Sequence, residues 1–129
     1  MNPHEDAVTL YRPVGRQELD LVRESGWRKF PPRLFWQPVF YPVLTEDYAM
    51  RIAREWNSRD PAVGNVGYVL KFKVLRDYIG QFVPQQVGGR ELMEYWIPAE
   101  ELEAFNANIV GLIELLHEFR HGKQWNEPE

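Results

Sequence analysis

Apolar residues recur at helical spacing in three stretches of the chain, and each stretch predicts a helix with one buried face. The clearest stripe follows positions i, i+3, i+4 and i+7: Ala49, Ile52, Ala53 and Trp56. It predicts a helix over 46–57, for which Thr45 supplies the N-terminal cap. The other two predicted helices cover 16–25, which ends at Gly26, and 98–108.

Strands are predicted where apolar residues alternate with polar ones or form short unbroken runs. At 68–74 the alternation places Lys71 and Lys73 on a solvated face. The run at 109–119 is apolar at most positions, which is typical of a strand buried on both faces. The other predicted strands cover 9–14, 39–43, 82–87 and 92–97. This order predicts an α+β domain with a split or strongly curved, mainly antiparallel sheet and about three helices.

One carboxylate interrupts the aromatic strand predicted at 92–97. Alternation places Glu94 on one face with Trp96, and Tyr95 and Ile97 on the other. An ionised group in the middle of a sheet is costly unless it has a partner, so Glu94 is the leading functional candidate, although a solvent-facing strand residue is the plain alternative. Glu91, in the predicted hairpin connection 88–91, replaces it if the register is shifted.

Composition sets the class of protein. The chain has 129 residues, 44% of them apolar, which suits a single domain over 1–129 with an ordered core at about 8–120 and loose termini. Asp and Glu outnumber Lys and Arg by 19 to 15, giving a net charge of −4. That balance argues against a dedicated nucleic-acid-binding surface, though not against a local basic pocket.

Several kinds of site and location are not expected. Cysteine is absent, and the histidines at 4, 117 and 121 lack a metal-ligand context, so no metal is expected. The N-terminus has no apolar signal core and no apolar run is long enough to span a bilayer. We therefore expect a cytoplasmic protein without membrane contact.

Three pieces of the chain resemble, in order, the motifs of the ADP-ribosyltransferase superfamily. The first is Leu10-Tyr11-Arg12, followed by a helix that ends in glycine. The second is the run FYPVLTEDYA at 40–49, which is similar to a strand with an aromatic position followed by a Thr-capped helix. The third is Glu94 in EYWIPAEEL. Over about 8–120 the chain also resembles small bacterial proteins labelled "ADP-ribosylation/crystallin J1".

The resemblance implies that NAD is a substrate. Arg12 would bind its ribose or phosphate, and Tyr41, or alternatively Phe40, would pack against nicotinamide. Glu94 would be the catalytic carboxylate that stabilises positive charge on the ribose as nicotinamide leaves. The protein would then transfer ADP-ribose to an acceptor, which could be a protein, a nucleic acid or a small molecule.

The chain departs from the family motifs at several positions, so other functions stay open. Pro13 follows Arg12, no Ser-Thr-Ser triplet is present, and Leu92 stands where arginine-modifying relatives have Glu or Gln. One alternative is a non-catalytic interaction or regulatory module of the same fold, and another is a phosphotransferase-like relative acting on RNA ends. Arg12 could equally pair with a surface carboxylate. The loop at 27–36 could cover a cofactor cleft, with Arg28, Lys29 or Arg33 meeting a pyrophosphate, or could simply be a packed loop.

Overall fold

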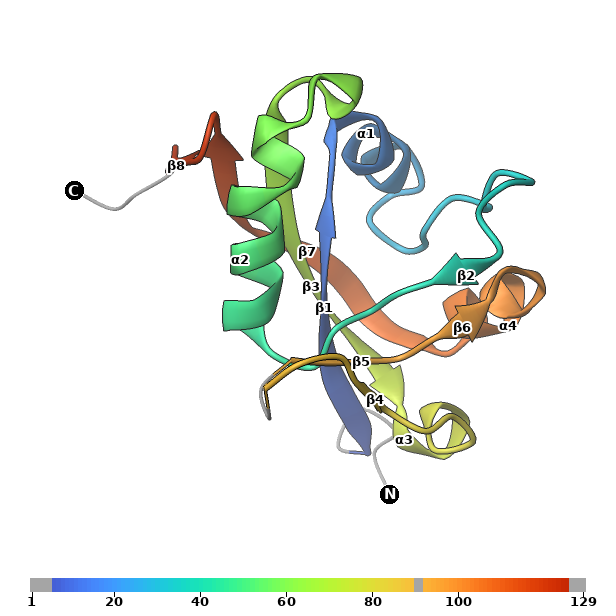
Figure 1. Cartoon of the computed structure of the whole chain (residues 1–129). Coiled ribbons are helices and arrows are strands. Elements are labelled where there is room, and N and C mark those ends of the chain that lie inside the picture. The colour runs from blue at the N-terminus through green and yellow to red at the C-terminus, as the bar shows by residue number, and fades with distance from the viewer. Residues whose placement is uncertain (1–5, 90–91, 126–129) are drawn as a thin grey trace.

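A four-stranded antiparallel sheet organises the structure, with its strands in the order β1-β3-β7-β8 (Figure 1). The computed structural model describes residues 6–89 and 92–125. The strands are β1 Ala7–Val14, β3 Val66–Leu75, β7 Ile109–Arg120 and β8 Lys123–Gln124. The predicted alternation is confirmed over 70–74, since Leu70, Phe72 and Val74 are buried and Lys73 is exposed, whereas Tyr68 and Val69 before them are both buried.

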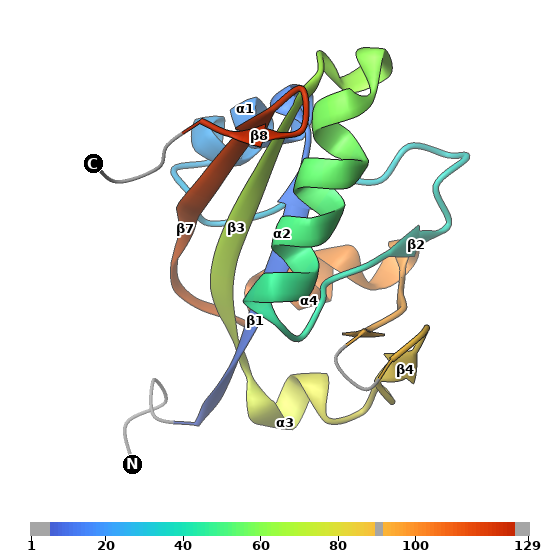
Figure 2. The same cartoon turned by 60° about the vertical axis from the view of Figure 1, so that its left-hand side comes forward.

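Helices cover both faces of this sheet (Figures 1 and 2). α2, Glu46–Glu55, lies on one face, and α1, Arg16–Glu24, lies with α4, Leu102–Ala107, on the other. All three helices were predicted, although the third begins as the 3₁₀ turn η4, Ala99–Glu101. The one-turn helix α3, Arg76–Ile79, brings the α-helices of the described ranges to four, against about three expected.

The placement of α2 follows from its first residue and its inner stripe. The Thr45 hydroxyl accepts a hydrogen bond from the Tyr48 N–H at 3.2 Å, which satisfies one of the free donors at the helix start. Ala49 and Ala53 are fully buried against the sheet. A side chain at Gly67 of β3 would overlap the carbonyl oxygen of Ala53, so this glycine lets α2 lie directly on the strand.

A cluster of phenylalanines forms the core between the sheet and α4. Phe30 packs edge-on against Phe72 with ring centroids 4.9 Å apart, and Phe40 packs against Phe105 at 5.3 Å. All four rings are at most 1% exposed. Two strands, a helix and one loop contribute these rings, so the loop at 27–38 is held by core packing as well as by its ends.

Beyond β1 the sheet curls through backbone bridges centred on Val43. Tyr11 and Val43 exchange both backbone hydrogen bonds, at 2.9 and 2.8 Å, and Val43 is in turn paired with Glu94. Two short ladders extend the curl: β2 Val39–Phe40 with β6 Ile97–Pro98, and β4 Gln85–Gln86 with β5 Met93–Glu94. The protein is therefore α+β with a curled antiparallel sheet.

Three predicted strands are much shorter than the sequence suggested. The stretch 39–43 pairs only at β2 and at Val43, 82–87 only at β4, and 92–97 is divided between β5 and β6. Pro42 has no N–H to donate, which interrupts the first of these. Glu94 therefore lies in a strand of only two residues, although it is paired on both sides, with Gln85 of β4 and with Val43. The predicted strand was too long, but the position of Glu94 between two neighbouring segments agrees with the prediction. Order also extends past residue 120, through β8 to Trp125.

The prediction that the strand at 109–119 is buried on both faces was wrong. In β7 the side chains of Leu112 and Leu115 are 53% and 41% exposed. Pairing with β3 is irregular at two points, and Gly111 has a φ of +75°. Such bulges redirect side chains, and the helices lie mainly over β1 and β3 (Figure 2). In the part of the chain that is described, no helix combines the length and apolar character needed to cross a membrane.

The phenylalanine core predicts that two Phe→Ala substitutions differ strongly in their effect on the free energy of unfolding. Phe72→Ala should lower the free energy of unfolding by about 3–5 kcal/mol, because it leaves a cavity beside the three remaining rings. Phe35→Ala should change it by less than about 0.5 kcal/mol, since Phe35 is 94% exposed. Urea denaturation of both variants measures the difference. Equal stabilities would contradict the packing described above.

Candidate functional site

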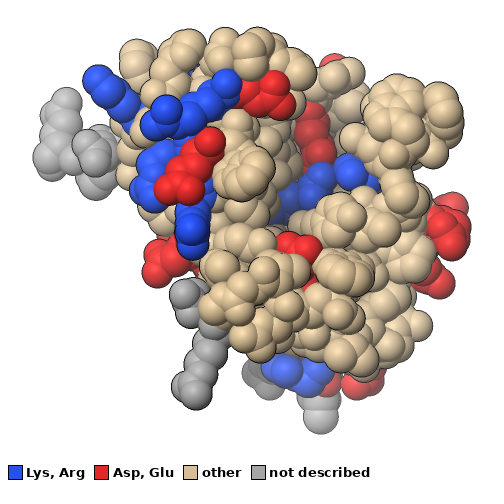
Figure 3. All heavy atoms as spheres, in the orientation of Figure 1, with Lys and Arg blue, Asp and Glu red and all other residues tan. Residues whose placement is uncertain are grey.

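A hollow lies on the face of the molecule seen in Figure 3, with Lys and Arg atoms at its floor and Asp and Glu atoms on either side. Its position follows from the backbone. The segment before Val43 leaves β1 and runs to β2, so the edge of β1 beyond Tyr11 is free of a paired strand in the described ranges. Arg12 is the first residue of β1 past that bridge.

Arg12 is held by Glu18 of α1. Its Nε and Nη2 donate to the two carboxylate oxygens at 2.6 and 2.9 Å, and its Nη1 donates to the Tyr41 carbonyl at 3.3 Å. The residue is 8% exposed. This bidentate, nearly buried pair has the strongest geometry available to an arginine and a carboxylate. It corresponds to the alternative that Arg12 pairs with a carboxylate, except that Glu18 is itself largely buried.

Arg33 approaches the same carboxylate from the loop at 27–38. Its Nη1 lies 3.9 Å from Glu18, its side chain is 12% exposed, and no described residue accepts a hydrogen bond from its buried Nε. Burial, and then the charge of Arg12, lower the pKa of Arg33. Two guanidinium groups therefore share one carboxylate, and the cluster keeps a surplus positive charge with one unsatisfied donor.

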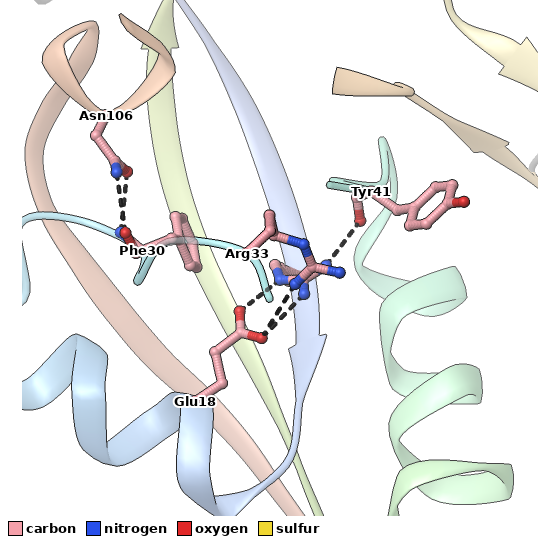
Figure 4. Close-up of polar contacts among 6 residues, drawn as sticks. Glu18, Phe30, Arg33, Tyr41 and Asn106 are labelled. Carbon is pink, nitrogen blue, oxygen red and sulfur yellow. Dashed lines mark hydrogen bonds and ion pairs between the residues drawn. The ribbon is translucent and has the colours of Figure 1, made fainter. Parts of the chain in front are cut away.

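The loop that carries Arg33 is anchored at its other end by Asn106 of α4 (Figure 4). The Asn106 side chain accepts from the Phe30 N–H and donates to the Phe30 carbonyl, both at 2.9 Å. Phe40 lies beneath the two guanidinium groups, with its ring centroid 4.4 Å from Arg12 Cζ and 5.9 Å from Arg33 Cζ. Phe40 is fully buried, so it supports the arginines and has no surface for a ligand.

Tyr41 contributes its backbone to this cluster and its ring to the surface. The carbonyl accepts from Arg12, whereas the ring is 41% exposed and turns away from Arg33 (Figure 4). The plain alternative for Tyr41, a core tyrosine with only its hydroxyl at the surface, therefore does not hold. An exposed ring beside a cationic cluster is available for stacking against a planar ligand.

Glu94 makes two hydrogen bonds of its own. Its Oε1 accepts from the Trp96 indole N–H at 2.7 Å, and its Oε2 accepts from the Tyr48 hydroxyl at 3.1 Å. Burial, and then the neighbouring Glu94 charge, raise the pKa of Tyr48, so its phenol stays protonated and donates. Each carboxylate oxygen keeps a further lone pair, which could accept a hydrogen bond from a ligand.

The structure brings the three predicted site segments together but sends two side chains to different faces. Residues paired directly across strands share a face, so Glu94 lies with Tyr11 and Val43 on the side of α2. Arg12, next to Tyr11, points to the side of α1. Glu91, the alternative carboxylate, lies outside the described residues.

Sequence reasoning did not single out Glu18 and Tyr48, although a signal was present. Glu18 lies four residues before Val22, and Tyr48 lies four residues before Ile52, so each belongs to the inward face of its helix. A polar group on an inward stripe is a candidate partner for a buried charge.

A cavity adjoins the cluster through Arg33. It has a volume of about 930 Å³ and lies between α1, the loop at 28–33 and α4, with both basic and acidic side chains in its lining. Within 6–89 and 92–125, no group of three or more His, Asp or Glu residues is arranged to hold a metal ion. No family model, curated protein or solved structure matches this chain.

The shared carboxylate predicts an asymmetric stability effect. Glu18→Ala leaves two buried arginines without a counter-charge and should lower the free energy of unfolding by about 3–5 kcal/mol. Glu55→Ala is the matched control, because its pairs with Arg51 and Arg54 are about half exposed; it should cost less than about 1 kcal/mol. Chemical denaturation checks both, and a Glu18 variant as stable as the control would contradict the role given to this residue.

Proposed function

We propose that the chain is an NAD-dependent enzyme with an ADP-ribosyltransferase-like fold, which cleaves the nicotinamide–ribose bond and transfers ADP-ribose to an acceptor. The observation that carries the proposal is the backbone ladder from Tyr11 through Val43 to Glu94. It places the strand with Arg12, the segment with Tyr41 and the segment with Glu94 side by side, although 82 positions separate the first residue from the last.

The cationic cluster supports binding of the pyrophosphate. Arg33 has an unsatisfied buried Nε, and the cluster has one positive charge more than Glu18 neutralises. A phosphate oxygen would satisfy that donor and balance that charge. Arg12 in turn would act mainly by fixing the floor of the site, since three of its nitrogens already donate to Glu18 and Tyr41.

The surroundings of Glu94 support a role in bond cleavage. Trp96 and Tyr48 fix the carboxylate from both sides, and neither donor carries a charge that would neutralise it. A fixed anion beside the ribose stabilises the positive charge that develops there as nicotinamide departs. The ring of Trp96, which is 48% exposed, borders this carboxylate. The ring of Tyr41, which is 41% exposed and lies beside the cationic cluster, would receive the nicotinamide.

Specific observations also favour the non-catalytic module as a second candidate. Arg12 and Glu94 both have protein partners and lie on different faces of the curl. The turn at 34–37 presents Phe35 and Trp36, which are 94% and 62% exposed and pack edge-on at 4.8 Å. Exposed aromatic side chains held on a turn are typical of surfaces that bind a partner.

Replacing the carboxylate separates the two candidates. Glu94→Gln keeps the shape and one acceptor but removes the charge, so nicotinamide release from NAD should fall by about a hundredfold or more while NAD affinity stays nearly unchanged. Glu100→Gln, at an exposed position of η4, is the matched control and should behave as wild type.

The outcomes of that assay are distinct when melting curves show that each variant is folded. Wild-type protein that neither binds NAD nor releases nicotinamide would establish the module. Full turnover in Glu94→Gln would show that another residue is the catalyst, with Glu91 the first to test.

Two further substitutions locate the two ends of the ligand. Arg33→Gln should lower the affinity for NAD and for ADP-ribose alike, by about 10–100-fold, because a charged hydrogen bond to the pyrophosphate that both ligands contain is lost. Tyr41→Ala should lower the affinity for NAD but not for ADP-ribose, because ADP-ribose has no nicotinamide. Calorimetric titration of both ligands checks this pattern. The same loss for both ligands in Tyr41→Ala would place nicotinamide elsewhere.

A further inference from the structure

Basic side chains gather at one end of this acidic protein, away from the hollow. Figure 3 shows most of the Lys and Arg atoms of this face together at the upper left, over the end of α2. We call the following set the basic end: Arg16, Arg51, Arg54, Arg59, Arg120 and Lys123. It holds six of the 15 Lys and Arg residues of the chain. Among the described residues, Glu55, Asp60 and Glu118 are carboxylates beside them.

Contacts between distant segments make the basic end a continuous surface. The Ser58 carbonyl accepts from the His121 N–H at 3.0 Å, and the Ser58 hydroxyl accepts from the Gly122 N–H at 2.8 Å. The Arg59 guanidinium lies so close to Gly122 that a side chain at this glycine would overlap it. These bonds fix the turn between β7 and β8 against the end of α2, so its charges are presented by ordered backbone.

A small pocket at the basic end is lined by two arginines, a histidine and an asparagine, together with Gly64 and Val66. It has a volume of about 310 Å³, and Arg16, Arg120, His121 and Asn65 contribute to its lining. Arg120 pairs with Glu118 at 2.5 Å, whereas Arg16 has no ion pair with a described carboxylate and lies 5.5 Å from the Tyr68 ring centroid. A phosphate group has the negative charge that this lining lacks, and acceptor oxygens for the two guanidinium groups.

Exposed indole rings accompany these charges. Trp125 is 62% exposed and lies under Arg120, with its ring centroid 4.6 Å from the guanidinium carbon. Trp56, at the end of α2, is 70% exposed. Cationic side chains that follow a phosphate backbone, together with aromatic faces on which bases stack, are the two features of single-strand binding surfaces. An acidic peptide would use the charges but would leave the indoles without a planar partner.

We propose that the basic end binds single-stranded nucleic acid, with phosphates at the arginines and bases stacked on the tryptophans. The site is separate from the hollow at β1 and does not depend on NAD binding. The net charge of −4 does not exclude it, because screening confines electrostatic attraction to about 8–10 Å at physiological salt and the local balance decides.

The test is fluorescence anisotropy with a labelled oligothymidine of about 16 nucleotides, the upper span of a single-strand site. The double variant Arg59→Gln/Lys123→Gln should weaken binding of the oligonucleotide by about tenfold at low salt. It should also reduce the slope of log affinity against log salt concentration by about 1.4, the value for two lost phosphate contacts. The matched control is Arg28→Gln with Lys29→Gln, which removes two exposed charges elsewhere and should change neither quantity.

A second pair of variants tests base stacking at two tryptophans whose exposed fractions are equal. Trp125→Ala should weaken binding by about 5–100-fold, the range for one stacked base, whereas Trp36→Ala should not; both indoles are 62% exposed in the native protein. Absence of wild-type binding at low salt would overturn the proposal, as would equal losses in the matched pairs. Displacement by polyglutamate as effective as by unlabelled oligothymidine, or equal affinity for duplex DNA, would overturn the assignment to single strands.

Discussion

The bidentate pair between Arg12 and Glu18 is the interaction around which the open side of the molecule is built. It joins the sheet edge to α1 with two short hydrogen bonds in a nearly buried setting. Burying one charge alone would be prohibitive, so neither residue can occupy this place without the other. Arg33 and the Tyr41 carbonyl attach to the same pair, which ties the loop at 27–38 and the segment before Val43 to the strand.

The curl of the sheet explains why a hollow exists beside that pair. A strand that continued along β1 would cover its edge completely. Here the neighbouring segment pairs with β1 at Val43 and then leaves it for β2. The side chain of Arg12 therefore lies beside an edge that has no paired strand in the described ranges, while Glu94 lies on the other face of the sheet, with Tyr48 of α2.

Charge is divided unequally over the surface. The hollow has a small positive surplus that is largely buried, while the basic end has an exposed one. The two differ in what they can bind. A buried guanidinium with one free donor suits a single, well-placed phosphate, and exposed arginines beside indole rings suit an extended chain of phosphates and bases.

The sequence by itself determined the α+β class, the three amphipathic helices, the Thr45 cap and the inward face of each helix, because these depend on local spacing and capping. It also indicated Arg12, Tyr41 and Glu94 as candidates in separate segments. Only the tertiary structure decided that Glu18 holds Arg12, that Tyr48 and Trp96 hold Glu94, and that β7 is partly exposed. These outcomes depend on which segments meet, where Pro42 interrupts pairing and where bulges redirect side chains, and residue spacing contains no information on contacts between distant segments.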